Sequence, residues 1–308
     1  MFINHLAMDD NYVCWTTETG SDLYRYPLES STSTPTAILA KTHFDKGALS
    51  KYPNGSLSRV GISLIFDDRQ STGQTETWAL RALNMETQTE SNLAQGNGAT
   101  NLYTFSSDGE WAVWIIGDSS VGTTTIESQN LQTGQSQELA YSNSLHNRWE
   151  QVAVSAGQAV AIQAGDAGRT LFLFELKSGQ SRKLLSYLTG SDIYGLSFDD
   201  KRIAWKTGTN SYGSTALYNL ENNEIEYLPD WGVSPVLVSH WLTWNAAYEQ
   251  ALYALDLESR QSFLVAKAEP GDTLTSVAIH GNWIGWCRVH SNIDHTKVDS
   301  RVEWRTLP

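Results

Sequence analysis

The chain has 308 residues, among them 12 Trp, 13 Tyr and 8 Phe, and only 18% of its residues are charged. This composition is rich in strand formers and unlike that of a disordered or coiled-coil chain. The formal charge of −13 argues against a nucleic-acid partner, because binding to a phosphate backbone requires clustered Lys and Arg.

The chain also lacks signals for membrane insertion and export. No stretch reaches the roughly 18 apolar residues that a membrane-spanning helix needs, so we expect no membrane insertion. The first residues lack the basic region and apolar core of a signal peptide, which predicts a cytoplasmic protein unless upstream residues have been removed. Cys14 and Cys287 lie in apolar stretches, so we expect two buried free thiols.

A pattern of short strands recurs seven times, with copies about 40 to 50 residues apart, the length of one four-stranded propeller blade. The second strand of each copy ends in a large apolar residue. The aligned residues are Trp15, Phe66, Trp114, Ile162, Trp205, Trp244 and Trp286. A second alignment marks the end of the third strand. Its residues are Leu28, Leu83, Leu131, Leu176, Leu220, Leu257 and Leu307.

The stretch from Thr170 to Leu184, TLFLFELKSGQSRKL, illustrates the outer half of one copy. An alternating apolar run is followed by a tight turn, where Gly179 takes a left-handed conformation, and by a short last strand. The second strands are almost continuously apolar, which predicts strands covered on both faces. Helical periodicity is absent. We therefore predict an all-β, seven-bladed β-propeller over residues 1–308 as a single domain, with a six-bladed ring as the alternative.

The last copy contains TSVAI, WIGWCRV and RVEWRTL and stops at Pro308. Residues 1–4 lie too close to the first predicted strand, HLAM, to reach back to this copy. We therefore predict that the last blade has three strands and an open edge, and that the ring closes by face packing between the first and last blades. A neighbouring subunit could cover the edge, which would make a homo-oligomer, or removed upstream residues could cover it.

These repeats resemble those of TolB-like and WD40-like β-propellers, on a second strand ending in Trp and a third strand reading L-Y-x-L-D-L before a turn and Q-S. The likeness covers nearly the whole chain. It is clearest at Ala251 to Leu264 and weakest in the second copy, where Phe66 replaces Trp. It implies a ring-shaped scaffold whose loops bind proteins, peptides or sugars. It implies no fixed catalytic residues, so none is transferred.

In a propeller the loops between the second and third strands and between blades lie on one face, which we call the loop face, and function usually lies there. The candidate ligand-binding residues on these loops are Trp149, Trp231, His43, Arg69, Tyr187, Tyr248 and His290. The candidate acid–base residues are His146, Arg148, Tyr194 and Tyr212. Because the loops differ between blades, we expect one asymmetric site.

The sharpest candidate is the run SLHNRWEQ at 144–151. Arg148 could bind a carboxylate, Trp149 could stack on a sugar or aromatic ring, and His146 could act as a base. The alternative is a solvated loop with Trp149 folded back over the blade. The run RVHSNIDH at 288–295 supplies metal-ligand residue types at His290, Asp294 and His295, but their spacing matches no known metal frame, so we expect no metal.

No nucleophile elbow, phosphate-binding loop, dinucleotide-binding glycine motif or Cys-x-x-Cys pair occurs, and we expect no cofactor. The first hypothesis is a scaffold that binds a small-molecule, glycan or protein ligand on its loop face. The second is a lyase, cyclase or hydrolase that uses His, Tyr and Arg at the mouth of the channel. The third is an assembly protein that pairs through its open edge.

Overall fold

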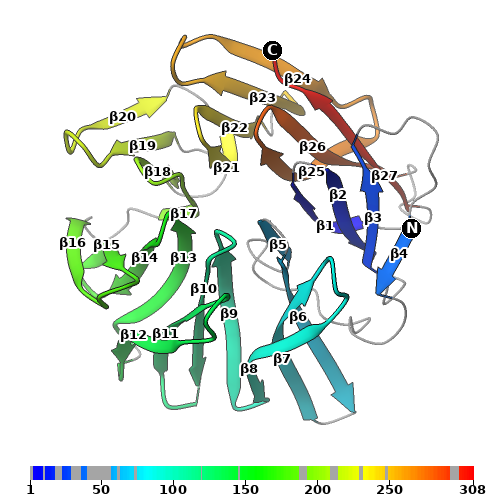
Figure 1. The fold of residues 1–308 in the computed structure, drawn as a ribbon. Coiled ribbons are helices and arrows are strands. Elements are labelled where there is room, and N and C mark those ends of the chain that lie inside the picture. The colour runs from blue at the N-terminus through cyan, green and yellow to red at the C-terminus, as the bar shows by residue number, and fades with distance from the viewer. Residues whose placement is uncertain are drawn as a thin grey trace.

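A computed structural model describes residues 3–9, 11–17, 23–28, 36–39, 57–60, 63–72, 75–118, 120–144, 146–186, 193–208, 214–228, 232–246, 249–291 and 298–308. These residues form seven antiparallel sheets, six with four strands and one with three. The sheets stand around a common centre (Figure 1). The chain is therefore a seven-bladed β-propeller, as the repeats predict.

Each blade takes its strands in chain order from the centre outward, as β17, β21 and β25 illustrate in Figure 1. Blade 1 contains β1 (Ile3–Met8), β2 (Tyr12–Thr17), β3 (Leu23–Pro27) and β4 (Thr36–Leu39). Blade 2 contains β5 (Leu57–Val60), β6 (Ser63–Thr72), β7 (Thr75–Asn84) and β8 (Glu90–Asn97). Blade 3 contains β9 (Thr100–Ser107), β10 (Trp111–Asp118), β11 (Thr123–Asn130) and β12 (Ser136–Ser142).

The remaining blades follow the same order. Blade 4 contains β13 (Arg148–Ser155), β14 (Gln158–Gly165), β15 (Gly168–Glu175) and β16 (Ser181–Ser186). Blade 5 contains β17 (Ile193–Phe198), β18 (Arg202–Thr207), β19 (Thr215–Asn219) and β20 (Ile225–Leu228). Blade 6 contains β21 (Gly232–Val238), β22 (Trp241–Ala246), β23 (Ala251–Asp256) and β24 (Ser262–Lys267). Blade 7 contains β25 (Asp272–His280), β26 (Trp283–Ser291) and β27 (Val298–Thr306).

Turns between the third and fourth strands repeat one left-handed position. The backbone φ is positive at Gln88, Gly134, Gly179, Asn223 and Arg260, and each of these residues donates its N–H to the carbonyl four positions earlier. Glycine adopts this conformation without strain, whereas a side chain makes it costly. The predicted left-handed Gly179 is confirmed, and three of the equivalent turns tolerate a larger residue.

Backbone hydrogen bonds correct the predicted alignment in blade 4. The residue after the third strand donates to the turn before the second strand: Leu131 to Glu110 in blade 3 and Leu176 to Gly157 in blade 4, at 2.7 and 3.0 Å. Counted from that turn, the position of Trp114 in blade 3 falls on Ala161 in blade 4. Ala161, and not Ile162, is therefore the structural equivalent of the repeated Trp.

Blade 2 needs a similar correction. The third-strand turn begins at Asn84, whose side chain accepts hydrogen bonds from Glu86 and Thr87, just as Asn130 begins the turn of blade 3. The equivalent of Leu131 is therefore Met85, which is buried, and the predicted Leu83 was wrong by two residues.

The ring closes between blades 7 and 1 through side-chain packing. No described strand adds to the sheet of β25, β26 and β27. Trp304 on β27 contacts Tyr26 on β3, with ring centroids 5.1 Å apart, and Val289 shares an apolar cluster with Leu6 and Trp15. The predicted three-stranded last blade, held by face packing, is confirmed.

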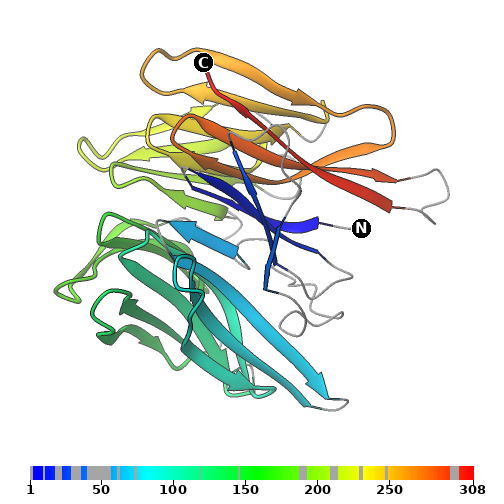
Figure 2. The ribbon, with the colours of Figure 1, turned by 45° about the vertical axis from the view of Figure 1, so that its right-hand side comes forward.

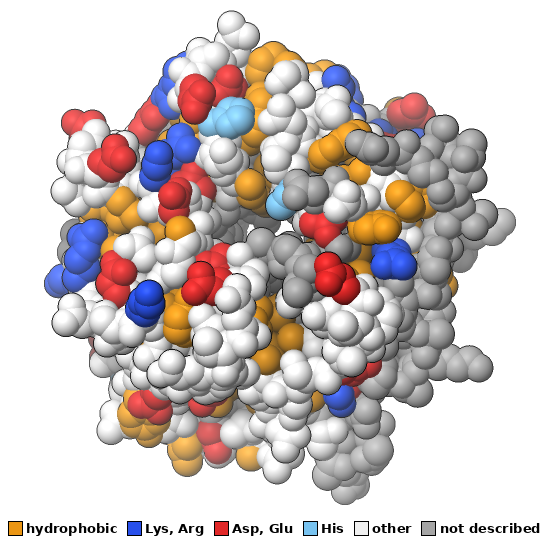
Figure 3. Space-filling model, viewed as in Figure 1, with side chains coloured by type: hydrophobic (Ala, Val, Ile, Leu, Met, Phe, Trp, Pro, Cys, Tyr) orange, Lys and Arg blue, Asp and Glu red, His pale blue; other side chains and the backbone are white. Residues whose placement is uncertain are grey.

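Two further observations concern the thiols and the surface. Cys14 and Cys287 are buried thiols that form no disulfide, as predicted. Among the described residues no helix is long and apolar enough to cross a membrane. On the side seen in Figure 3, acidic side chains lie near the centre of the ring together with a histidine and apolar side chains.

Candidate functional site

Bulges redirect the loop-face ends of the innermost strands. The pairing register shifts within β1, β9, β13, β17, β21 and β25. In β25 the shift falls between Thr275 and Ala278, and Ser276 has a φ of 51°. Such a bulge changes which residues face each other beyond it. As a result, Asp272 lies directly opposite His290 on β26.

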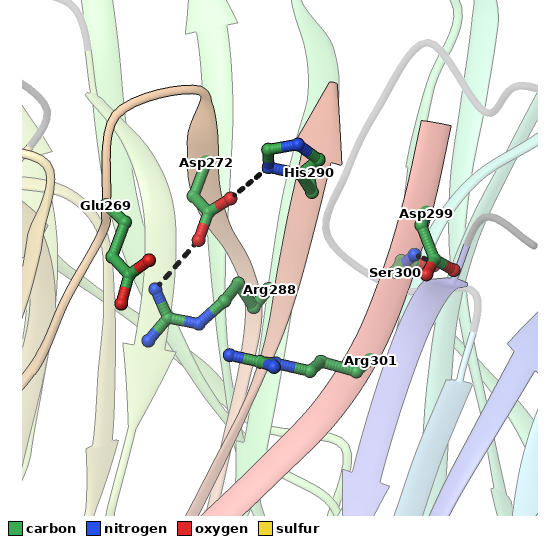
Figure 4. Close-up of a pocket in the computed structure, with 7 residues that line it drawn as sticks. All are labelled: Glu269, Asp272, Arg288, His290, Asp299, Ser300 and Arg301. Carbon is green, nitrogen blue, oxygen red and sulfur yellow. Dashed lines mark hydrogen bonds and ion pairs between the residues drawn. The ribbon is translucent and has the colours of Figure 1, made fainter. Parts of the chain in front are cut away.

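A pocket of about 280 Å³ opens at this end of blade 7 (Figure 4), where β25 begins, β26 ends and β27 begins. It is lined by Glu269, Asp272, Arg288, His290, Asp299, Ser300 and Arg301. In Figure 4 Glu269 and Arg301 flank the Arg288 guanidinium. The connections from β24 to β25 and from β26 to β27 place this pocket on the loop face.

Asp272 is the fixed anion of the pocket. Its Oδ1 lies 2.7 Å from His290 Nδ1, and its Oδ2 accepts a hydrogen bond from Arg288 Nη1 at 3.2 Å. Only 7% of the Asp272 side chain and 11% of the Arg288 side chain are exposed. Burial favours the neutral acid, but the hydrogen bonds from His290 and Arg288 outweigh it and hold the pKa of Asp272 below its usual value. Asp272 is therefore a carboxylate at neutral pH.

Arg288 is held from three directions. Besides Asp272, it donates through Nε to Glu303 at 3.0 Å and through Nη1 to the Lys267 carbonyl at 3.1 Å. The hydrogen bond to Glu303 is the main reason that the pKa of Arg288 is raised. Burial alone would raise the pKa of Glu303, but bonds from Arg288 and from Trp286 Nε1, the latter at 2.7 Å, lower it. These contacts fix the floor of the pocket.

His290 is the part of this network that reaches solvent. Its side chain is 60% exposed, and Figure 4 shows the second ring nitrogen turned away from Asp272. An imidazole held at Nδ1 by a buried carboxylate keeps one orientation and offers Nε2 to a ligand. His290 can therefore donate or accept a hydrogen bond or transfer a proton there.

A second His–Asp pair on the loop face, in blade 4, is much more exposed. His146 Nδ1 lies 2.9 Å from Asp166 Oδ1, but the two side chains are 71% and 80% exposed. Two solvated side chains gain little from such a pair, because water screens the attraction and holding both costs entropy. Of His146 and His290, the latter is consequently the better oriented.

The other two residues of the SLHNRWEQ run divide between surface and core. Arg148 is 60% exposed and pairs with Glu150 at 2.9 Å. Trp149 is 5% exposed and packs edge-on against Phe172 and Phe174, with centroids 5.3 and 5.8 Å apart. It shares an apolar cluster with Ala161, the small residue at the repeated Trp position. The indole is thus part of blade packing, where it offers no face to a ligand.

Other predicted site residues are only partly described or not described. Arg69 lies on β6 and Tyr194 on β17, and their side chains are outside the description. Outside the described residues altogether lie Tyr212, Trp231, His43, Tyr187, Tyr248, Asp294 and His295. Within the described ranges, no group of three or more His, Cys, Asp or Glu side chains is placed to hold a metal ion.

Sequence reasoning missed Asp272 and Arg288. Asp272 follows Pro270 and Gly271 and has the context of an ordinary turn residue. A usable signal was Arg288 itself, because a charge that continues the apolar strand WIGWC needs a buried partner.

Comparisons with known proteins identify the fold. The sequence matches no known protein family and no curated protein. An oligogalacturonate lyase in complex with manganese has a TM-score of 0.62 and 12% identity, over 96% of this chain and 85% of that one. A prolyl endopeptidase gives 0.62 and 12% over 99% of this chain and 50% of that one. A putative TolB from Agrobacterium tumefaciens gives 0.52 and 11% over 73% and 80%.

At such identities the likeness concerns the fold alone. The chain is a β-propeller, and this fold does not by itself assign a function. Its fold is similar to that of TolB-like propellers, as the repeats predict.

Proposed function

We propose that the protein is a propeller scaffold that binds a carbohydrate chain in the blade 7 pocket on its loop face. The observation that carries this proposal is the fixed arrangement of Arg288 and His290 around the buried Asp272. A rigid set of donors and acceptors gains affinity because little ordering is needed on binding.

The chemistry of the lining supports a hydroxyl-rich ligand. All seven lining residues are polar or charged, and charges of both signs alternate around the opening. An anionic ligand would meet Glu269 and Asp299, and a cationic one would meet Arg288 and Arg301. A sugar hydroxyl both donates and accepts hydrogen bonds, so it can use both sets of groups.

Calorimetric titration of the protein with neutral and acidic oligosaccharides tests the proposal. His290→Ala and Arg301→Ala should each weaken binding by about tenfold or more, because each removes a hydrogen bond that involves a charged or polarised group. The matched controls are His240→Ala and Arg182→Ala, which lie outside the pocket. Failure of every oligosaccharide to bind, or equal binding by all four variants, would reject the carbohydrate site. A protein captured by the wild type but not by the pocket variants would instead assign a protein ligand.

A second function, acid–base catalysis, is favoured by one observation. Asp272 orients His290 so that Nε2 is free to move a proton at a bound substrate. Two neighbours in fold are named as an oligogalacturonate lyase and a prolyl endopeptidase, so oligosaccharides and proline-containing peptides are the first substrates to try. His290→Gln should abolish turnover while His146→Gln retains it. The opposite result would move the chemistry to blade 4.

A further inference from the structure

The register of β27 identifies which of its backbone groups point away from β26. Leu307 donates its N–H to the Asn282 carbonyl at 2.6 Å, and the β26–β27 register runs without a shift from there to Val298. Antiparallel pairs alternate between bonded and non-bonded. Hence Glu303 and the other odd-numbered residues of β27 bond to β26, whereas Val302, Trp304 and Thr306 direct their N–H and C=O groups outward. Ser300 also faces outward, but its N–H already donates to Asp299 Oδ1 at 2.9 Å.

This edge differs from that of the other blades. In each of blades 1 to 6 the third strand is paired with a fourth, but in the described part of the chain no strand lies beside β27. Figure 2 shows β27, in red, crossing the front of the molecule as the last strand of its blade.

The side chains of β27 separate by face. Val302 and Trp304 belong to the apolar cluster against blade 1. The opposite face carries Asp299, Arg301, Glu303 and Arg305, so that charge alternates in sign along the strand. Asp299, Arg301 and Arg305 are exposed. Turning the strand end for end about Val302 places Arg301 opposite Glu303 and Asp299 opposite Arg305.

We propose that a second copy of this chain pairs antiparallel along β27, with the two-fold axis passing between the two Val302 residues. Both geometric requirements agree: Val302 has outward backbone groups, and the same centre brings opposite charges together at four cross-strand positions. Opposite charges across an antiparallel pair stabilise it, and a two-fold interface must be self-complementary. A peptide of one charge sign would meet like charge at every second position. The strand that fits this edge is therefore β27 itself.

Such a dimer reaches the pocket. Asp299 and Arg301 line it, so pairing brings Arg305 and Glu303 of the second copy to its rim. The test of the dimer does not depend on the ligand proposed above, because it measures the mass of the protein and not ligand binding.

The first test is Val302→Pro, measured by sedimentation equilibrium. Proline removes the N–H that would bond to the second copy, while the bonds to β26 are unaffected because that N–H points outward. We expect the wild type to dimerise at micromolar concentration and the variant to remain monomeric, with an unchanged circular dichroism spectrum. A monomeric wild type at about 100 μM, where interfaces with Kd below that value assemble, would overturn the proposal, as would an undiminished dimer of the variant.

A charge exchange makes the test independent of the proline. Arg305→Asp alone and Asp299→Arg alone each place like charges opposite one another at two symmetric positions, which should weaken dimerisation about tenfold or more. In a heterodimer of the two variants, positions 299 and 305 again carry opposite charges across the interface. An equimolar mixture should therefore recover the dimer mass of the wild type. Arg182→Asp, on β16 at the rim of blade 4, should change nothing. A mixture that associates no better than either variant alone would contradict the assigned register.

Discussion

Replacement of Arg288 by Met should destabilise the protein strongly at neutral pH and much less in acid. The substitution removes the partner of two carboxylates, Asp272 and Glu303, and the donor to the Lys267 carbonyl, while the side-chain stem is retained. Removing one partner from a largely buried ion pair costs about 3–5 kcal/mol. Glu303 is 23% exposed, so we place the expected loss at pH 7 at the lower end, about 3 kcal/mol.

The pH dependence follows from the two carboxylates. In the wild type the pKa values of Asp272 and Glu303 are lowered, so their ionised forms stabilise the fold above the unfolded pKa values of about 3.9 and 4.3. That contribution is lost as the pH falls through the lowered folded values. Without Arg288, burial raises the pKa of each carboxylate, and protonation then removes the uncompensated buried charge from the variant. The difference between the two proteins should narrow as the pH falls from about 5 to about 3.

Urea denaturation across this range measures the effect, with Arg182→Met, which lies on the surface of β16, as the control. The control should stay within about 0.5 kcal/mol of the wild type. A loss in Arg288→Met that is equal at pH 7 and pH 3.5 would mean that packing, and not charge pairing, sets the role of Arg288.

Three further experiments probe the scaffold. Nothing lies within 4 Å of a Cβ added at Gly134, whose φ is 74°, so Gly134→Ala should lower the unfolding free energy by about 1 kcal/mol through backbone strain alone. Gln88→Ala, at the equivalent turn position, should change it by less than half of that. Urea denaturation of both variants measures the difference. A Cβ at Gly285 would lie 2.7 Å from Met8 Sδ, so Gly285→Val should force blades 7 and 1 apart and lower the unfolding free energy by about 2 kcal/mol. A variant as stable as the wild type would show that the Met8 side chain moves aside. Burial raises the pKa of the Cys287 thiol to about 11, and the Cys14 side chain is fully buried, so neither cysteine should react with a thiol reagent at pH 8 until the protein unfolds. Fast labelling of the folded protein would contradict the burial.

The number of blades could be predicted because propeller repeats carry two independent marks, a large residue in the second strand and a Leu after the third. The misplacement at Leu83 arose in a third strand, where Met85 is buried at the position that carries Leu in the other blades, whereas the misplacement at Ile162 arose in a second strand. Second strands covered on both faces are apolar at consecutive positions, so composition does not reveal which residue faces which blade. Ala161 hid the pattern further, because Trp149 from the neighbouring strand β13 fills its cluster. Only the hydrogen bonds of the turns resolve the register.

The pocket was less predictable, because it depends on a bulge. Without the extra residue in β25, Asp272 would not oppose His290, and a local sequence pattern does not reveal where an innermost strand kinks. The sequence named His290 as a candidate ligand-binding residue but gave no sign of its partner Asp272. It also gave weight to His146, whose Asp partner is as solvated as the histidine itself. Burial of the anchoring carboxylate separates the two pairs, and burial is a property of the assembled ring.

The closure between blades 1 and 7 also determines how the ring can come apart. Among the described strands, the main-chain ladders stay inside single blades, so parting the first blade from the last breaks side-chain contacts such as Trp304 on Tyr26 and no backbone hydrogen bond. The molecule then behaves as a linear array whose ends touch, in which each blade is stabilised mainly by its nearest neighbours. The terminal blades lose one neighbour on opening, whereas the central ones lose none. At concentrations where the chain is monomeric, amide exchange should consequently be fastest in β1 and β27 and slowest near β14, in the middle of the array.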